Sequence, residues 1–140
     1  MQNHLIKLSA LCAALLVVGC QSVGGLNTSS SAEEAPSPKN PEFSSELDSF
    51  NKQFPNAKVS KYENDSIAFN NERKLDEKGN CHGKSKYPIT LVLVLDATGK
   101  VTRTVTDVEN AKAACFRTSY AGVQFPRPPI APYRKAILLK

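Results

Sequence analysis

The sequence lacks a run of apolar residues long enough to cross a bilayer. Its main apolar run, from Leu8 to Val18, is broken by Ser9 and Cys12 and falls short of the about 20 residues that a membrane-spanning helix needs. The chain also has no Gly-rich phosphate loop, and its 18 basic and 13 acidic residues are spread along it rather than gathered in blocks. These absences argue against a membrane-spanning protein, a phosphate-binding loop and a nucleic-acid-binding protein.

Histidine is nearly absent beyond the first 20 residues, where His82 is the single example. His82 directly follows Cys81, and adjacent residues rarely reach the geometry of a nucleophile and its base; no third group is evident. Two cysteines and one histidine also lack a zinc-ligand spacing. The sequence therefore predicts no catalytic residue, no metal site and no cofactor.

What is present begins with an export signal. Lys7 and the amino terminus are positive, the apolar run follows, and Gly19 is a small residue before a cleavage point. Val17-Val18-Gly19-Cys20 resembles the lipobox of bacterial lipoproteins. That resemblance implies that residues 1–19 are removed and that Cys20 carries a thioether-linked diacylglycerol and an N-acyl chain, a stable membrane anchor. An ordinary signal followed by a chance cysteine is the alternative.

The same resemblance bears on location. Gln21 is not the aspartate that is associated with inner-membrane retention, so we expect a protein anchored in the outer membrane and facing the periplasm, with surface display left open. The formal net charge of +5 fits contact with an anionic envelope component, and it fits a solvated surface equally well. Nucleic acid is not an expected partner there.

Two cysteines remain once Cys12 is removed with the signal and Cys20 is acylated. Cys81 and Cys115 form an even pair in an oxidising compartment, which favours a disulfide over two free thiols. The chain-entropy model gives about 4 kcal/mol of stabilisation for a loop of this size.

The expected domain organisation has three parts: a signal peptide (1–19), a lipidated and flexible tether (20–40) and one domain (41–140). The tether is rich in Ser, Gly, Asn and Pro and has a random-coil reach of about 25 Å. Asn40-Pro41-Glu42 is typical of a helix start, and an apolar stripe at helical spacing follows up to Pro55. We expect the stripe to pack on the domain core; docking to a partner or to lipid is the alternative. Its members are Phe43, Leu47, Phe50 and Phe54.

The rest of the domain is predicted as mainly β-structure. We expect short strands at 57–61 and 66–70 and a loop at 71–86. Residues 89–95 are apolar on both faces, which indicates a central strand, and Asp96-Ala97-Thr98-Gly99 is hairpin-turn chemistry before a second strand at 101–108. A helix from about Val108 to Tyr120, capped by Asp107, and a last strand from Tyr133 to Leu139 follow. The expected sheet-facing residues of that helix are Ala111, Ala114, Cys115 and Thr118.

Residues 87–140 resemble the C-terminal domain of TonB-type proteins. The matching features are Tyr87-Pro88, the long apolar strand, the Asp96-x-x-Gly99-x-Val101 turn, a helix carrying Cys115, and Phe125-Pro126-x-Pro128 before a closing strand. The resemblance implies an α+β fold, a small antiparallel sheet with a helix packed on one face in the order β-hairpin–α–β, here preceded by an extra amphipathic helix. Ile89 continues directly into strand where the family usually has a small helical segment. An energy transducer also has a membrane helix and a long arm, so the resemblance implies no autonomous energy transduction.

The resemblance also implies a partner-binding edge. Family members pair the closing strand with a partner's extended segment or with a second copy, so the predicted contact residues are Tyr133, Arg134, Lys135 and Ile137. Arg134 and Lys135 are also charges of the kind that protect an edge from pairing. The predicted function is protein interaction in the envelope. The first alternative is binding of an envelope ligand (peptidoglycan or lipid), and the second is a thiol-dependent enzyme.

Overall fold

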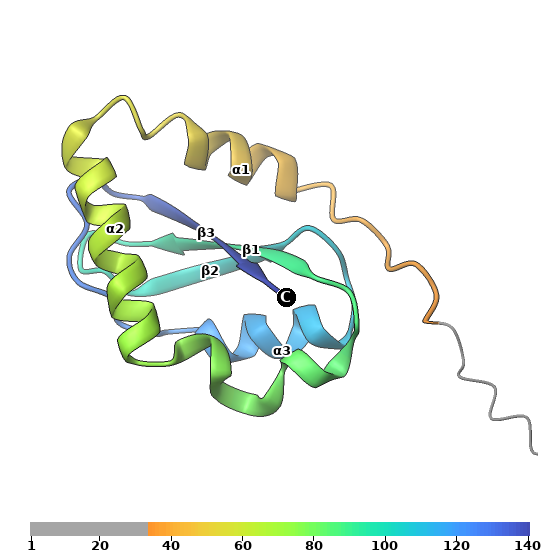
Figure 1. Ribbon diagram of the computed structural model, residues 1–140. Coiled ribbons are helices and arrows are strands. Elements are labelled where there is room, and N and C mark those ends of the chain that lie inside the picture. Colours follow the sequence, from red (N-terminus) through yellow and green to blue (C-terminus); the bar gives the residue numbers. More distant parts are fainter. Residues whose placement is uncertain (1–33) are drawn as a thin grey trace, which may run out of the picture. The chain divides into compact units, whose positions relative to one another are not determined.

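A three-stranded antiparallel sheet lies at the centre of the structure, a computed structural model that describes residues 34–140. The strands are β1 (Ile89–Leu95), β2 (Val101–Thr106) and β3 (Tyr133–Leu139), in the order β2-β1-β3 (Figure 1). The predicted α+β class is confirmed. The predicted signal peptide, Cys20 and the tether up to residue 33 lie outside the described residues.

β1 is the central strand because both of its faces are apolar. Leu91 to Leu95 are all buried. The turn that follows depends on Gly99, whose φ is 90° and where a Cβ would lie 2.3 Å from the backbone oxygen of Phe125. The Asp96 carboxylate accepts hydrogen bonds from the backbone N–H groups of Thr98 (2.8 Å) and Lys100 (3.1 Å), which closes the turn.

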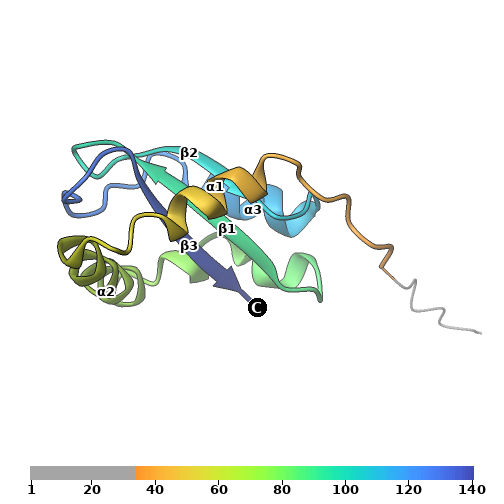
Figure 2. The same ribbon diagram turned by 90° about the horizontal axis from the view of Figure 1, so that it is seen from above.

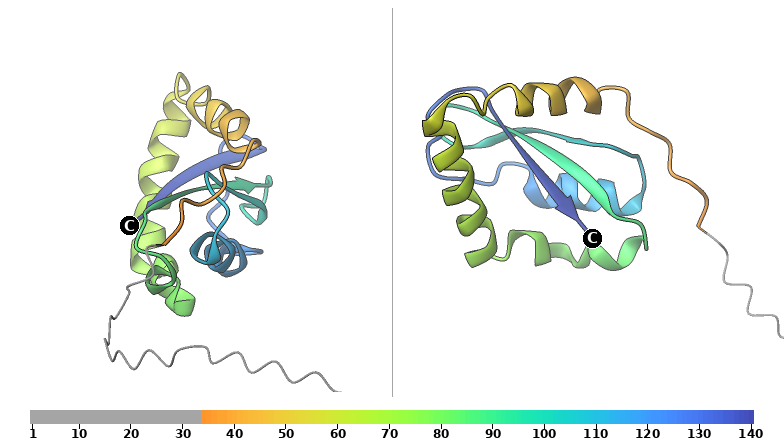
Figure 3. Two further views of the ribbon diagram at one scale, coloured as in Figure 1. Left: turned by 90° about the vertical axis from the view of Figure 1, so that its right-hand side faces the viewer. Right: turned by 45° about the horizontal axis from the view of Figure 1, so that its top comes forward.

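Helices cover both faces of the sheet. One face carries the leucines of β1 and packs on α3 (Ala111–Tyr120), and the other is crossed by α1 (Phe43–Asn51). Figure 2 shows α1 passing over the strands, and the side view in Figure 3 separates α1, the sheet and α3 into layers. Glu46 of α1 is buried and pairs with Arg103 of β2 and Arg134 of β3. The predicted stripe of α1 is half-buried.

The segment predicted as two short strands is one helix, α2 (Ala57–Glu72). Asn56 caps its start by accepting a hydrogen bond from the Lys58 N–H at 3.0 Å. The prediction from β propensity was wrong because the buried residues follow a helical spacing that brings them onto one face. They are Val59, Tyr62, Ser66 and Asn70. The predicted loop that follows contains two 3-10 helices, η1 (Leu75–Asn80) and η2 (His82–Lys84).

The predicted sheet-facing side of α3 was also wrong. Ala111, Ala114 and Thr118 are exposed, and the helix buries Lys112, Ala113, Phe116 and Tyr120 instead. Burying the two aromatic rings removes far more apolar area from water than burying small residues would, and this decides the helix rotation. Asn110, rather than Asp107, caps the helix by accepting from the Ala113 N–H at 2.8 Å.

The compact unit begins at Glu34 rather than at Pro41. Pro38 accepts a hydrogen bond from the Glu109 N–H (2.8 Å), and Asn40 donates its N–H to the Asp107 carbonyl (2.9 Å). Residues 34–40 therefore run beside the segment that leads into α3 and belong to the domain. Within the described part of the chain, none of the helices has the length and apolar character that a membrane span needs.

Candidate functional site

The Cys81-His82 pair is not arranged as a nucleophile and a base. The sulfur atoms of Cys81 and Cys115 lie 2.06 Å apart, at disulfide distance, and join the segment between η1 and η2 to α3. The His82 ring packs edge-on against Phe116, and its Nδ1 lies 2.6 Å from the Lys140 backbone oxygen. A sulfur in a disulfide has no thiolate for nucleophilic attack.

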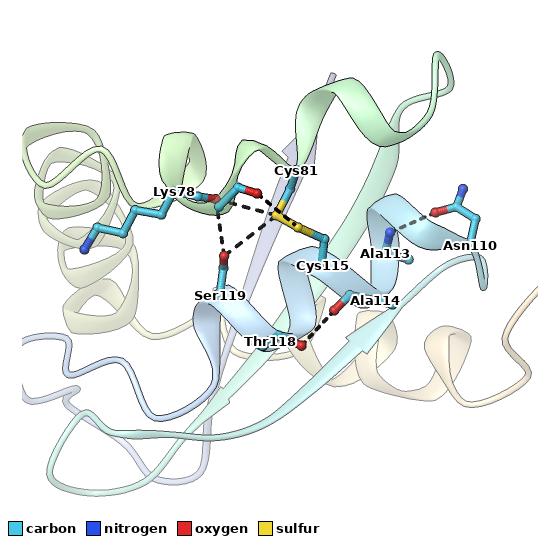
Figure 4. The surroundings of a disulfide bond; sticks show 9 residues. Lys78, Cys81, Asn110, Ala113, Ala114, Cys115, Thr118 and Ser119 are labelled. Atoms are coloured by element: carbon cyan, nitrogen blue, oxygen red, sulfur yellow. Dashed lines mark hydrogen bonds between the residues drawn. A yellow bond between two sulfur atoms is a disulfide. The ribbon is translucent and has the colours of Figure 1, made fainter.

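Figure 4 shows Ser119 and the backbone of Lys78 beside the cysteine pair. The Ser119 hydroxyl donates to the Lys78 carbonyl at 3.3 Å and lies 3.7 Å from the Cys81 sulfur. No set of three or more His, Cys, Asp or Glu residues within 34–140 is placed to hold a metal ion. The cysteine pair and the bond from Ser119 to Lys78 join α3 to the η1 region.

The outer edge of β3 is the part of the sheet where the predicted site lies, and its first half is occupied. The Gln53 side-chain amide donates to the Arg134 carbonyl at 2.9 Å and accepts from the Arg134 N–H at 2.7 Å. These are the two bonds that a neighbouring strand would make with an edge residue. The start of β3 is therefore closed to a pairing partner by a residue just after α1.

The second half of the same edge is free. Backbone groups alternate in direction along an antiparallel strand, so Ala136 and Leu138 point their N–H and C=O groups the same way as Arg134, away from β1. Among residues 34–140, no hydrogen bond outside the β1–β3 ladder involves the backbone of Ala136 or Leu138. The edge thus offers four unpaired backbone groups in two residues.

A groove runs beside this free half, between α2 and β3. It has a volume of about 210 Å³. Ile67 and Leu138 are 44% and 58% exposed, and they are two of the three large hydrophobic side chains that the described part of the chain exposes. The other residues that line the groove are Asn70, Asn71, Lys135, Ala136 and Ile137.

The predicted contact residues divide into buried and accessible positions. Tyr133 and Lys135 are 0% and 1% exposed, because the Tyr133 hydroxyl and the Lys135 ammonium (2.8 Å) both bond the Glu63 carboxylate on α2. Arg134 pairs with Glu46 at 3.0 Å. Both charges, which are of the kind that protects an edge from pairing, are engaged by carboxylates of α1 and α2. Ile137 lines the groove, as does one side of Lys135.

Three buried residues near Glu63 of α2 have shifted pKa values: Tyr62, Tyr133 and Lys135. Burial lowers the pKa of Lys135, and the Glu63 carboxylate opposes that change. Burial, followed by the hydrogen bond to Glu63, raises the pKa of Tyr133 above its usual range. Burial also raises the pKa of Tyr62 to about 12. The cluster holds one face of α2 against β3 and so fixes the width of the groove.

Three residues of the site were missed by reasoning from the sequence: Gln53, Ile67 and Leu138. Ile67 lies in a segment that was predicted as a strand. Gln53 lies in the predicted N-terminal helix, and that prediction depended on the apolar residues around it. Leu138 is the one with a sequence signal, because alternation along the last strand places it on the face opposite Tyr133. No pattern in the sequence brings α2 to that edge.

No protein-family model, curated protein or solved structure matches this chain. Its function is therefore argued from the groove, the free strand edge and the motifs of the sequence.

Proposed function

We propose that this protein is a non-enzymatic, lipid-anchored interaction domain of the bacterial envelope that binds an extended segment of a partner protein along the free half of β3. The carrying observation is the position of Ile67 and Leu138. These exposed aliphatic side chains flank a groove at the place where the backbone of Ala136 and Leu138 is unpaired. Unpaired strand groups beside apolar side chains are the two elements of strand addition.

Each element supplies a different part of the binding. The outward groups of Ala136 and Leu138 accept and donate main-chain hydrogen bonds irrespective of the partner's sequence. The groove selects side chains, because alternate residues of an added strand point to the same face. One aliphatic or aromatic side chain of the partner fits the space between Ile67 and Leu138, where Asn70 and Asn71 add polar contacts at the α2 wall.

The opposite edge of the sheet is less suited to an added strand. At the start of β2, the N–H of Val101 already donates to the Val123 carbonyl at 2.9 Å, and Val101 accepts from the Gly122 N–H at 3.1 Å. The residues that follow on β2 are Thr102, Arg103 and Thr104, which offer less apolar surface than Ile67 and Leu138. The free half of β3 is therefore the better candidate.

The cellular setting is supported by sequence motifs. The lipobox-like Val17-Val18-Gly19-Cys20 supports a lipid anchor, and Gln21 supports the outer membrane facing the periplasm. The order of hairpin, helix and closing strand supports the likeness to TonB C-terminal domains. A Cys20→Ala variant should leave the membrane fraction, whereas continued membrane association would point to a bound partner or to α1.

The test of strand addition is site-directed photo-cross-linking in cells. We expect a cross-linking residue at Leu138 to capture a defined protein, and the same residue at Thr102 on the other edge to capture none. A proline at Leu138 removes one outward N–H donor without touching the β1 ladder, so L138P should abolish capture from a cross-linker placed at Ile67. Recovery of glycan or lipid in place of protein would favour the envelope-ligand alternative, and equal capture at Thr102 and Leu138 would contradict the edge.

A further inference from the structure

A second surface lies where the chain enters the domain. The Glu34 carboxylate accepts a hydrogen bond from the Lys86 N–H at 3.2 Å, and the hydrogen bond from Ser85 holds the pKa of Glu34 below its usual value. The segment before Glu34 therefore joins the domain beside Lys86.

This end exposes an aromatic ring beside one lysine, with a second exposed lysine two residues earlier in the chain. Lys84 and Lys86 are exposed, Tyr87 is 39% exposed, and the Lys86 Nζ lies 5.1 Å from the centre of the Tyr87 ring. Beside them is a hollow of about 280 Å³, lined by Pro36, Ser37, Tyr87, Pro88 and Val108. We call these residues, with Lys84 and Lys86, the entry face.

The ionised Glu34 carboxylate lies near Lys86 and offsets part of the positive charge. Within residues 34–140, neither Lys84 nor Lys86 forms an ion pair, and Glu109 pairs with Arg117 at 2.7 Å instead. A tyrosine with an apolar body and a polar tip, next to lysines, suits the boundary between lipid headgroups and acyl chains. Each lysine held near an anionic membrane raises affinity about five-fold.

The entry face is also held near a membrane by the length of the chain. If Cys20 is acylated, residues 21–33 connect it to Glu34, and a random coil of that length reaches about 20 Å. We propose that the entry face binds the anionic phospholipid surface of the bilayer that holds Cys20. This inference rests on the lipid anchor of the proposed function. It orients the domain with the Asp96–Gly99 turn, at the far end of β1, away from the membrane.

The first test uses the unmodified lipidated protein in vesicles. A water-soluble amine-acylating reagent is applied in vesicles of phosphatidylglycerol and phosphatidylcholine and in vesicles of phosphatidylcholine alone, and modified lysines are quantified by mass spectrometry. We expect several-fold protection of Lys84 and Lys86 in the anionic vesicles. The start of α2 lies at the opposite end of the domain from the point where the described chain begins (Figure 1). Lys58 and Lys61 in that first part of α2 are exposed, and they should be modified equally in both.

The second test exploits the absence of tryptophan from the chain. A tryptophan introduced by Y87W should be quenched by brominated acyl chains in phosphatidylglycerol-containing vesicles. One introduced by A97W, about 25 Å away along β1, should not be quenched. K84E/K86E should abolish the quenching of Y87W, whereas K58E/K61E, with the same change of charge, should leave it.

The outcomes separate this inference from the proposed function. Equal labelling of all four lysines, or equal quenching of Y87W and A97W, would overturn the membrane-facing role while leaving the strand edge intact. A mass spectrum of the purified protein without acyl chains on Cys20 would overturn both the anchor and this inference. If Y87W has a low melting temperature, its quenching is not used, and the lysine labelling of the unmodified protein decides the outcome.

Discussion

Gln53 pairs with the backbone of Arg134 as a neighbouring strand would. Its side-chain amide accepts from the Arg134 N–H at 2.7 Å and donates to the Arg134 carbonyl at 2.9 Å. A side chain from the end of one helix thus replaces the first pairing position of an edge strand. This divides β3 into a closed half and an open half, and it limits an added strand to Ala136 and Leu138.

Replacing Gln53 should lengthen the available edge. Q53A removes both bonds to Arg134, so we expect faster hydrogen exchange of the Arg134 amide and a loss of about 1–2 kcal/mol in the free energy of unfolding. Because a longer part of the edge is then free, a cross-linking residue at Leu138 should also capture more of the partner protein in this variant. N51A, at an exposed position near the end of α1, is the matched control. Unchanged exchange at Arg134 in Q53A would show that the amide does not cap the edge in solution.

The buried pair of Glu63 and Lys135 should contribute strongly to stability. Lys135 is 1% exposed and its ammonium lies 2.8 Å from the Glu63 carboxylate. E63Q leaves that charge buried without its partner, so we expect a loss of about 3 kcal/mol in urea unfolding. The double variant E63Q/K135M removes both charges and should recover part of the loss. A double variant that loses the full sum of both single effects would contradict coupling between the two residues.

Alkaline pH should destabilise the domain through its buried tyrosines. The pKa of Tyr62 is raised from 10 to about 12, and burial also raises the pKa values of Tyr120 and Tyr133. Above pH 10 the native state therefore holds more protons than the unfolded chain on these groups, so the free energy of unfolding falls as pH rises. The lowered pKa of Lys135 has the opposite sign, because there the unfolded chain binds the extra proton.

Urea unfolding between pH 9 and pH 12 measures this effect. We expect stability to be lost progressively from about pH 10 upward, in the range where the unfolded tyrosines ionise. Y62F removes one of the groups and should make the decline shallower, whereas Y87F, at a ring that is 39% exposed, should not. A decline of equal slope in Y62F and the parent protein would contradict the assignment.

The Cys81–Cys115 pair should resist thiol reagents until it is reduced. Thiol titration of the unfolded, unreduced protein is expected to find neither cysteine free, and two reactive thiols would show that the pair is not oxidised. Reduction should lower the free energy of unfolding by about 4 kcal/mol, because an open chain gains entropy when it unfolds. C81S/C115S should match the reduced protein, which separates loss of the bond from effects of the reductant.

The sequence by itself determined the central sheet. β1 was predicted as a central strand because both of its faces are apolar. The Asp96–Gly99 turn was predicted because Asp and Gly are typical residues of hairpin turns. These signals are local, since each depends on residues close together in the chain. The predicted α+β class, with its small antiparallel sheet, is confirmed.

Only the tertiary structure decided what surrounds that sheet. The α2 segment has polar residues and some β propensity, and it is helical because Val59 and Tyr62 are buried against the core and Asn56 caps its start. The rotation of α3 followed from Phe116 and Tyr120, which are larger than the residues of the expected face. Which half of β3 is free depends on Gln53, which is 81 positions from Arg134. Such contacts join segments far apart in the chain, and no local pattern encodes them.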